Sequence, residues 1–476
     1  MDSHIPLVVD LDGTLIRTDL LAESGLSYIK ESPYHALKLA GLLFKGKASL
    51  KRELAKEFQF DVTTLPYVPE VLTYILEQKS RGRKIILATA SDAALAQKIA
   101  SYLELFDQVL ATQDNLNLSA HNKAKRLCDD IGEQQFDYMG NSRDDIAVWK
   151  VARKAIVVNP EPGVLSKAYQ LGNVQKVIDD RPKKTIIYAK ALRLHQWAKN
   201  VLLFAPLLAA HQAFDLGKLS EGALAFLLFG MCASSVYLLN DLLDIPDDRH
   251  HHSKKKRPIP AGLMPIKSAV LLAPALCISA ITISSFLLPS LFTLCLAAYI
   301  VLTSLYSFFL KRILFIDVIT LALLYTQRII AGVAVFDVRM SFWLLALSTF
   351  IFLSLALVKR YTELISARDN HKLGQTKGRG YHTNDIELIS SLGGSAGYIS
   401  ALVLALYIQD PATASLYTRP EYIWLACPVL LYWISRTWIL AHRGEMNDDP
   451  VVFAMKDKVS LGCAALIGVI FTCAAL

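Results

Sequence analysis

Hydrophobic and polar positions divide this chain into two parts that meet near residue 190. Before that point, short apolar runs of strand length alternate with helix-like patterns. The strand-like runs are Ile5–Asp10, Lys84–Leu87, Val109–Ala111, Phe136–Met139 and Ala155–Val158. Strands that alternate with helices are typical of a parallel, doubly wound sheet whose sites lie at the carboxyl ends of the strands. We therefore predict an α/β domain over residues 1–180, followed by a charged, proline-broken linker at 181–191.

The second part, residues 192–476, consists mainly of long apolar runs. We count nine candidate transmembrane helices, most of which reach the roughly 17–25 apolar residues that cross a bilayer. They are Val201–Phe214, Gly222–Leu239, Ser268–Leu288, Ser290–Leu310, Ile313–Phe336, Met340–Val358, Ile389–Ile408, Ile423–Leu440 and Val459–Leu476. Pro289 interrupts the uncharged stretch between the third and fourth runs and is the expected hairpin turn. This pattern predicts an all-α polytopic membrane bundle.

The loops between these runs predict an orientation. The loops after the even-numbered runs hold 17 Lys and Arg residues in all, and those after the odd-numbered runs hold 3. Positively charged loops stay on the cytoplasmic side of a membrane. We therefore expect a protein of the inner (cytoplasmic) membrane, with the N-terminal domain and the even-numbered loops facing the cytoplasm.

Composition narrows the partners. The hydrophobic fraction of 53% and the mean hydropathy of +0.35 fit a bilayer protein, and 476 residues make a single domain improbable. The net charge of +8 suits either anionic lipid or phosphorylated substrates. Outside the membrane loops no basic stripe is interleaved with aromatic residues, so a nucleic-acid partner is not expected. The seven cysteines show no CxxC spacing, which argues against zinc ligands.

The densest chemistry lies in Asn240–Gly262, which follows the second apolar run. Asp241, Asp244 and Asp248 are three and four positions apart, so they would share one face of a helix. Three close carboxylates repel one another unless a cation lies among them, and hard oxygen ligands favour Mg²⁺. The basic run Lys254–Arg257 can neutralise a phosphorylated substrate. The alternative is a solvated positive-inside loop, but carboxylates at the mouth of a membrane helix are costly and usually functional.

This stretch resembles the first aspartate-rich motif of the UbiA superfamily of intramembrane prenyltransferases. More narrowly, it resembles the branch of decaprenyl-phosphate phosphoribosyltransferases, whose pattern reads NDxxDxxxDRxHPxKxxRPIxxG. The positions in register are Asn240, Asp241, Asp244, Asp248, Arg249, His251, Lys254, Arg257, Pro258, Ile259 and Gly262. His252 stands where the family has proline. The resemblance implies that the three aspartates are the catalytic, Mg²⁺-binding residues and that Asn240, Lys254 and Arg257 contact the substrate.

The resemblance to this branch extends over residues 192–476. Further matching positions are Gln196, Trp197, Lys199, Asn200, Tyr306, Ser307, Lys311, Asp317, Arg328, Gly332, Lys359, Arg360, Tyr361 and Glu363. It implies substrate-binding roles for Lys199, Lys311, Arg328, Lys359, Arg360 and Tyr361. Two other interpretations stay open: Asp317 and Arg328 form a structural pair, or Lys359 and Arg360 anchor their helix at the membrane interface.

The loop after the sixth predicted span differs from that of the wider superfamily, and this difference bears on which reaction is catalysed. Prenyltransferases that act on aromatic rings resemble one another in a second acidic cluster, DxxxD, after the sixth span. No DxxxD occurs between Lys359 and Leu388, and a basic cluster there suits a lipid monophosphate. We therefore predict a Mg²⁺-dependent enzyme that transfers 5-phosphoribose from phosphoribosyl diphosphate to a polyprenyl phosphate, with release of pyrophosphate. Alternatives are transfer of a prenyl group to an aromatic or other acceptor, and a phosphatase that the bundle only anchors. Homo-oligomerisation stays open.

The N-terminal domain carries a second resemblance. Its first strand ends in DLDGT, which is similar to the first motif of the haloacid dehalogenase-like hydrolases, and the resemblance covers residues 7–158. It implies a Rossmann-like haloacid dehalogenase fold in which Asp10 attacks a phosphoryl group and Asp12 acts as general acid and base. Thr89 and Lys123 match the second and third motifs and would bind the phosphoryl oxygens and offset their charge.

The fourth motif, GNSRDD, departs from that family. Its usual first aspartate is replaced by Asn141, while Asp145 is retained. The resemblance implies a Mg²⁺ site made by Asp10, Asp12, Asn141 and Asp145, weakened by the neutral amide. The domain is then either an active phosphatase that removes the 5-phosphate of the product or a degenerate domain kept for packing or regulation.

Overall fold

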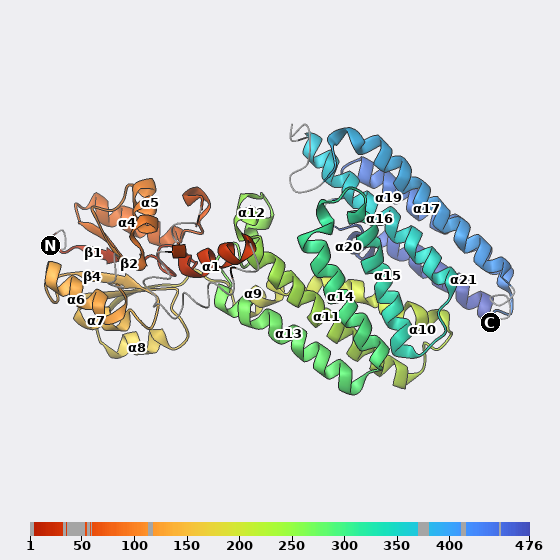
Figure 1. The fold of residues 1–476 in the computed structure, drawn as a ribbon, viewed down its shortest axis with the longest axis horizontal. Coiled ribbons are helices and arrows are strands. Elements are labelled where there is room, and N and C mark those ends of the chain that lie inside the picture. The colour runs from red at the N-terminus through yellow and green to blue at the C-terminus, as the bar shows by residue number, and fades with distance from the viewer. Residues whose placement is uncertain are drawn as a thin grey trace. The chain divides into compact units, whose positions relative to one another are not determined.

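The computed structural model describes residues 4–31, 35, 53–54, 58, 60–112, 118–369, 380–410, 416–446 and 449–476 (Figure 1). The chain forms two compact units, of which unit 1 comprises Met1–Leu192 with Tyr237–Ala273 and unit 2 comprises Arg193–Val236 with Pro274–Leu476. The start of the membrane region predicted at residue 192 lies next to the first of these boundaries. Tyr237–Ala273 carries the aspartate-rich motif and belongs to unit 1. The hydrophobic pattern does not predict this, because it places the segment within the membrane region.

Unit 1 contains a sheet of six parallel strands in the order β3-β2-β1-β4-β5-β6. The strands are β1 Leu7–Val9, β2 Ile85–Asp92, β3 Gln108–Thr112, β4 Asp137–Gly140, β5 Lys154–Val158 and β6 Val174–Ile178. The first five confirm the predicted strands to within a few residues. The edge strand β6 was not predicted, because its short mixed sequence VQKVI is only partly apolar.

Helices cover both faces of this sheet, as a doubly wound fold requires (Figure 1). Leu7 and Val9 of β1 pack in one core with α4 and α5, while Val8 between them packs with α6, α7 and α8 on the other face. The described helices that lie wholly in unit 1 are α1 Leu20–Glu31, α4 Pro69–Ser80, α5 Ala93–Leu103, α6 Ala120–Ile131, α7 Ile146–Val151, α8 Val164–Gln170, α9 Lys184–Ala191 and α12 Ile245–His250. Helix α9 occupies the segment predicted as a linker.

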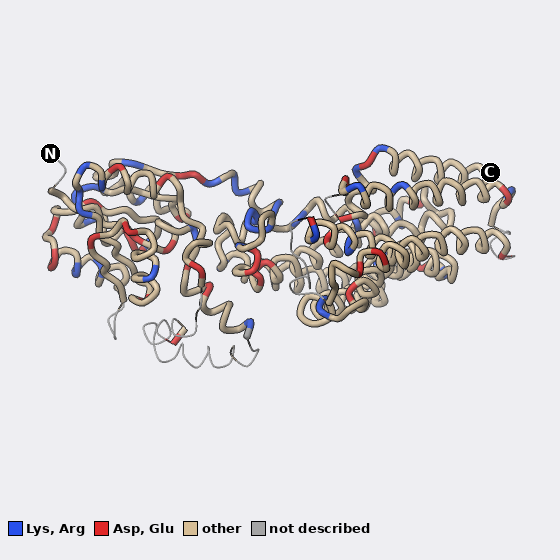
Figure 2. The backbone as a smooth tube through the Cα atoms, turned by 90° about the horizontal axis from the view of Figure 1, so that it is seen from above, with Lys and Arg blue, Asp and Glu red and all other residues tan. Residues whose placement is uncertain are grey.

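Eight helices within the described residues are long and apolar enough to cross a membrane. Charged residues are sparse along the helices of unit 2 (Figure 2). The apolar helices of the chain are α11 Leu216–Leu243, α13 Ile266–Leu287, α14 Ser290–Phe308, α15 Ile316–Phe336, α16 Phe342–Asp369, α17 Ile386–Gln409, α19 Ala426–His442 and α21 Lys458–Ala475, with the shorter α20 Pro450–Lys456. The predicted hairpin turn is confirmed, since Pro289 is the N-cap of α14.

The first of the nine predicted spans has another structure. Its residues belong to an 11-residue 3-10 helix, η2 (Leu194–Phe204), and to the five-residue helix α10 (Ala205–Ala209). The segment packs tightly on α15, where a Cβ added at Gly332 would lie 2.0 Å from the Leu203 carbonyl oxygen. Trp197 anchors it to α11 by donating from Nε1 to Ser234 Oγ at 2.9 Å. These contacts between distant segments override the α-helical pattern.

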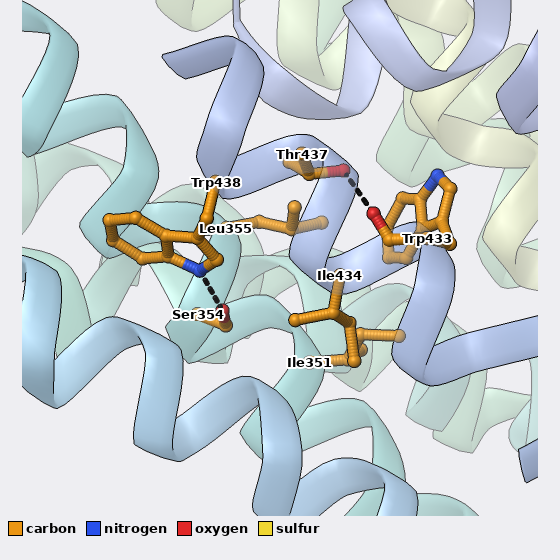
Figure 3. A pocket seen from close by; sticks show the side chains of 7 residues that line it. All are labelled: Ile351, Ser354, Leu355, Trp433, Ile434, Thr437 and Trp438. Atoms are coloured by element: carbon orange, nitrogen blue, oxygen red, sulfur yellow. Dashed lines mark hydrogen bonds between the residues drawn. The ribbon is translucent and has the colours of Figure 1, made fainter. Parts of the chain in front are cut away.

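Helices α16 and α19 illustrate how closely unit 2 is packed. Seven side chains line a gap that cannot hold the centre of a water molecule (Figure 3). Trp438 Nε1 donates to Ser354 Oγ at 3.1 Å across this gap, and Thr437 donates to the Trp433 carbonyl oxygen at 2.8 Å. This region is therefore core rather than a substrate site.

Candidate functional site

The candidate site of the N-terminal domain lies at the carboxyl ends of three adjacent central strands. Asp10 directly follows β1, Thr89 lies on β2, and Asn141 directly follows β4. Because β2, β1 and β4 are neighbours and parallel, their carboxyl ends meet at one edge of the sheet. Residues that are separated by up to 131 positions are thus brought to one place.

Four buried side chains form the centre of this site. Lys123 Nζ donates to Asp10 Oδ1 at 2.6 Å and to the Tyr138 hydroxyl at 2.9 Å, and Tyr138 donates to Asp145 Oδ1 at 2.7 Å. Burial raises the pKa of Asp10 to about 7, with a contribution from the nearby Asp145 and against the lowering effect of Lys123. The pKa of Lys123 is raised by Asp10 and Asp145, although burial opposes this. Lys123 therefore stays positively charged between two carboxylates.

The loop after β4 is shaped by Asp145. Its Oδ2 accepts from the backbone N–H groups of Asn141 and Ser142 at 3.0 and 2.8 Å. Asn141 Oδ1 accepts a hydrogen bond from Thr14 at 3.2 Å. A Cβ added at Gly13 would lie only 2.2 Å from the amide nitrogen of Asn141. Gly13 also has a φ of +79°, which favours glycine. Asn141 is thus held in place, facing the loop that carries Asp10.

Asp12 connects the site to the helix that follows. Its Oδ1 accepts from the backbone N–H of Leu20, the first residue of α1, at 2.9 Å, and Ser91 donates to its Oδ2 at 2.5 Å. Thr89, fully buried, accepts from the Ser91 N–H at 3.0 Å. The four predicted motifs therefore come together in one site, whose carboxylate and amide oxygens are of the type that Mg²⁺ prefers.

The aspartate-rich motif has a different geometry from the one predicted. Helix α11 ends at Leu243 and α12 begins at Ile245, so the three aspartates do not lie on one continuous helix. Asp241 and Asp248 nevertheless lie on one side, as their spacing of seven residues predicts, since Arg257 Nη1 donates to Asp241 Oδ1 at 3.0 Å and to Asp248 Oδ2 at 2.7 Å. Both aspartates are buried, and burial raises the pKa of Asp248 despite Arg257 and Lys254.

The other predicted residues of this motif are more exposed. Asp244 contacts Lys30 at 3.4 Å, Lys254 lies 3.8 Å from Asp248, and Asn240 is half-buried in the last turn of α11. In the part of the chain that the structure describes, no three Asp, Glu, His or Cys side chains gather closely enough to hold a metal ion. The carboxylates of Asp241 and Asp248 still fit a cation site. The Arg257 guanidinium between them now neutralises the negative charge that a bound metal ion would neutralise.

Unit 2 contains a buried cluster that the sequence only partly indicated. Asp449, the N-cap of α20, accepts from Lys199 at 2.8 Å and from Lys359 at 3.4 Å, both at Oδ2, and from the Tyr325 hydroxyl at 2.9 Å. Although burial opposes it, these lysines hold the pKa of Asp449 well below its usual range. Asp449 was missed, because it lies nine residues after the eighth apolar run and outside any motif that the sequence analysis singled out.

Arg328 lies among aromatic rings. Its guanidinium is 5.1 Å from the ring centroid of Phe229, 5.3 Å from that of Tyr299 and 5.8 Å from that of Tyr325. Its Nε donates to Asn200 at 3.2 Å. The structural pair between Asp317 and Arg328 is not formed, since Asp317 pairs with Arg360 instead.

The remaining predicted binding residues have protein partners of their own. Arg360 is fully buried and contacts Asp317, Glu363 and Tyr306, while Tyr381 donates to Asp317 at 2.5 Å. The Tyr361 hydroxyl pairs with His442 Nδ1 at 2.8 Å. Lys311 is half-buried in the short 3-10 helix η4 (Leu310–Arg312).

Comparison with protein families and known proteins places this geometry in context. The model of the UbiA prenyltransferase family matches residues 201–459, more than half of the chain. The protein y4nM of Sinorhizobium fredii is 35% identical over 99% of this chain and 92% of its own length. A decaprenyl-phosphate phosphoribosyltransferase of Mycobacterium tuberculosis is 36% identical over 57% of this chain and 88% of its own length.

Solved structures resemble each part separately. A UbiA homolog from Archaeoglobus fulgidus bound to GPP and Mg²⁺ is 14% identical and covers 61% of this chain and all of its own, with a TM-score of 0.46. A HAD family hydrolase from Salmonella enterica resembles the N-terminal region, at 17% identity over 37% of this chain and 68% of its own, with a TM-score of 0.28.

Proposed function

Because this chain belongs to the UbiA prenyltransferase family, whose members are membrane enzymes, we propose that it transfers 5-phosphoribose from phosphoribosyl diphosphate to a polyprenyl phosphate. The cationic cluster of unit 2 is the observation that carries the proposal. Lys199 and Lys359 both pair with Asp449, and the Arg328 guanidinium lies over the ring of Phe229. Three cationic side chains in this unit suit an anionic acceptor. The similarity of residues in this half to decaprenyl-phosphate phosphoribosyltransferases supports the same substrates.

The aspartate-rich motif would bind the donor. Asp241 and Asp248, with Asp244 nearby in sequence, would hold Mg²⁺, which would neutralise the diphosphate. In this proposal Arg257 turns from the two carboxylates to the diphosphate, and Lys254 adds a second positive charge, so that both stabilise the departing pyrophosphate. Asn240 contributes an amide at the end of α11.

The acceptor would be held by Lys199, Lys359 and Arg328. A lipid phosphate is already anionic at neutral pH, so it attacks the ribose C1 without a strong general base. The C1–oxygen bond to pyrophosphate breaks as the new C1–oxygen bond to the lipid phosphate forms. Arg360 already pairs with Asp317 and Glu363, so we assign it the role of fixing α16 against α15.

The N-terminal domain would then act on the 5-phosphate of this product. Asp10 attacks phosphorus, Asp12 protonates the ribose oxygen as its bond to phosphorus breaks, and Lys123 and Thr89 hold the phosphoryl oxygens. Asp12 next takes a proton from water, which attacks the aspartyl-phosphate and releases inorganic phosphate. Mg²⁺, held by Asp10, Asp12, Asn141 and Asp145, would offset charge on the phosphoryl group. Asn141 weakens this site without removing its oxygen donor.

We further propose that the protein lies in the inner membrane and that both sites are on its cytoplasmic side. The uneven distribution of Lys and Arg in the loops supports this orientation, provided that Leu194–Ala209 crosses the bilayer. Eleven residues at the 3-10 rise of about 2.0 Å and five at about 1.5 Å give a length of roughly 30 Å. That length is comparable to the hydrocarbon thickness of about 30 Å.

Lipid mass spectrometry tests the transferase. Purified protein in nanodiscs is incubated with Mg²⁺, polyprenyl phosphate and phosphoribosyl diphosphate, and in parallel with a prenyl diphosphate and an aromatic acceptor. The proposal predicts a lipid-linked pentose in the first reaction. A prenylated acceptor in the second reaction, with no lipid-linked pentose in the first, would favour prenyl transfer. Phosphatase turnover with neither lipid product would favour an anchored phosphatase.

A further inference from the structure

Helix α1 of the N-terminal domain contacts the aspartate-rich motif, and both belong to unit 1 (Figure 1). The first turn of α1 carries Glu23, and Arg249 follows Asp248 directly in α12. The two terminal nitrogens of Arg249 donate to the two carboxylate oxygens of Glu23, one of them at 2.9 Å, while Nε donates to the Pro260 carbonyl at 3.0 Å. Glu23 is 5% exposed and Arg249 8% exposed, so this bidentate pair is largely buried.

Weaker contacts surround this pair. Lys30 at the end of α1 lies 3.0 Å from Asp247, and Lys267 lies 3.2 Å from Asp19. Gly262, with a φ of +69°, allows a close approach, since a Cβ there would lie 2.6 Å from the Cβ of Arg17. The lysine pairs are exposed and contribute little, whereas breaking a buried pair leaves an uncompensated charge. The Glu23–Arg249 pair is therefore the main polar link between the two segments.

Helix α12 depends on such an anchor. It has only six residues and follows the break at Asp244, where backbone hydrogen bonds from Asp244 to Asn240 and from Asp248 to Asp244 are its link to α11. So short a helix needs contacts beyond its own backbone to hold its position. An open cavity of about 370 Å³ lies beside it, lined by Phe58, Phe60 and Lys98, by Pro246 and His250 of α12, and by the Glu23–Arg249 pair. Because this side of α12 faces open space, packing there cannot fix its position.

The same α1 is linked to the phosphatase site. The backbone N–H of Leu20 donates to Asp12, and Thr18 donates to Glu23. A continuous chain of contacts thus runs from Asp12 through the first turn of α1 to Arg249. Asp248, the neighbour of Arg249, shares Arg257 with Asp241.

We propose that Glu23 is a positioning residue for the aspartate-rich motif: by pairing with Arg249 it fixes α12 and thereby orients Asp248, so that the N-terminal domain completes the transferase site of this chain. This inference rests on the donor-binding role proposed above for the motif. A residue that only stabilised the fold would leave the affinity for the donor unchanged in the folded protein. A positioning residue changes that affinity, as removal of groups that orient metal ligands typically does, by about 10- to 100-fold.

The test uses the full-length protein in nanodiscs with Glu23→Gln, which keeps the side-chain shape and removes the charge. Asp19→Asn is the matched control, because it removes an exposed pair with Lys267 from the same turn and leaves an N-cap residue in place. Hydrogen–deuterium exchange is measured over residues 245–259, together with KM for phosphoribosyl diphosphate and hydrolysis of p-nitrophenyl phosphate.

We expect Glu23→Gln to accelerate exchange over residues 245–259 and to raise this KM about 10- to 100-fold. Phosphatase turnover should stay unchanged, because Asp12 accepts from the backbone N–H of Leu20, which the substitution leaves in place. Asp19→Asn should match the wild type. The double variant Glu23→Gln with Arg249→Gln should be no worse than the single one, because the two side chains act as a unit. Unchanged exchange and KM in Glu23→Gln would overturn the inference. A wild type that makes no lipid-linked pentose would instead refute the proposed function, and the exchange data would still report whether α1 holds α12.

Discussion

Replacing Asp449 by asparagine tests whether its negative charge is what stabilises Lys199 and Lys359 next to each other. Asp449 Oδ2 is contacted by Lys199 at 2.8 Å and by Lys359 at 3.4 Å. The Asp449 side chain is 12% exposed and that of Lys199 is 8% exposed, so water screens this pair poorly. Asparagine keeps the shape and the oxygen acceptor but removes the only negative charge that these contacts provide.

The structure sets the size of the effect. Since both lysine nitrogens contact one oxygen, they lie no more than about 6 Å apart, and at an effective dielectric constant of about 20 two such charges repel by at least about 3 kcal/mol. Removing one partner of a buried ion pair costs about 3–5 kcal/mol. We therefore expect the free energy of unfolding to fall by about 3–5 kcal/mol in Asp449→Asn.

Denaturant unfolding in nanodiscs, followed by tryptophan fluorescence, measures this loss. Asp457→Asn is the matched control, because Asp457 also caps a helix but pairs with a more exposed partner, Arg436. We expect that control to lose about 1 kcal/mol. Polyprenyl phosphate should restore stability to Asp449→Asn more than to the wild type, since its phosphate supplies the missing negative charge. Equal losses in the two variants, or no added protection by the lipid, would refute the reasoning.

Three further variants test the two sites. Asp10→Asn should leave the amount of lipid-linked pentose unchanged while mass spectrometry finds its 5-phosphate retained, and continued phosphate release would refute Asp10 as nucleophile. Asn141→Asp should raise Mg²⁺-dependent hydrolysis of p-nitrophenyl phosphate, because Thr14 can still donate to the new carboxylate, and an unchanged rate would show that Asn141 is not the weak point. Arg257→Gln should lower the Mg²⁺ concentration needed for half-maximal transfer but reduce kcat about 100- to 1,000-fold, because the leaving pyrophosphate loses a cation. An unchanged Mg²⁺ requirement would argue against Asp241 and Asp248 as ligands.

The sequence by itself determined the local features of this protein. Five of the six strands and all but the first of the nine apolar runs follow from hydrophobic patterns within short windows, because side-chain burial repeats with the period of each element. The motifs around Asp10 and Asp241 also identify residues that the structure places in polar clusters. Helix η2 shows the limit of such patterns, since its form depends on the close approach of α15 at Gly332.

The tertiary structure alone decided which charges meet. Glu23 and Arg249 are 226 positions apart, and Lys199 and Asp449 are 250 positions apart. Neither pair can be predicted from the hydrophobic pattern. An ion pair needs only that the fold brings two side chains into contact, whatever the number of residues between them. The break of the helix at Asp244 is local by contrast, because Pro246 lacks the backbone N–H that a continuous helix would need.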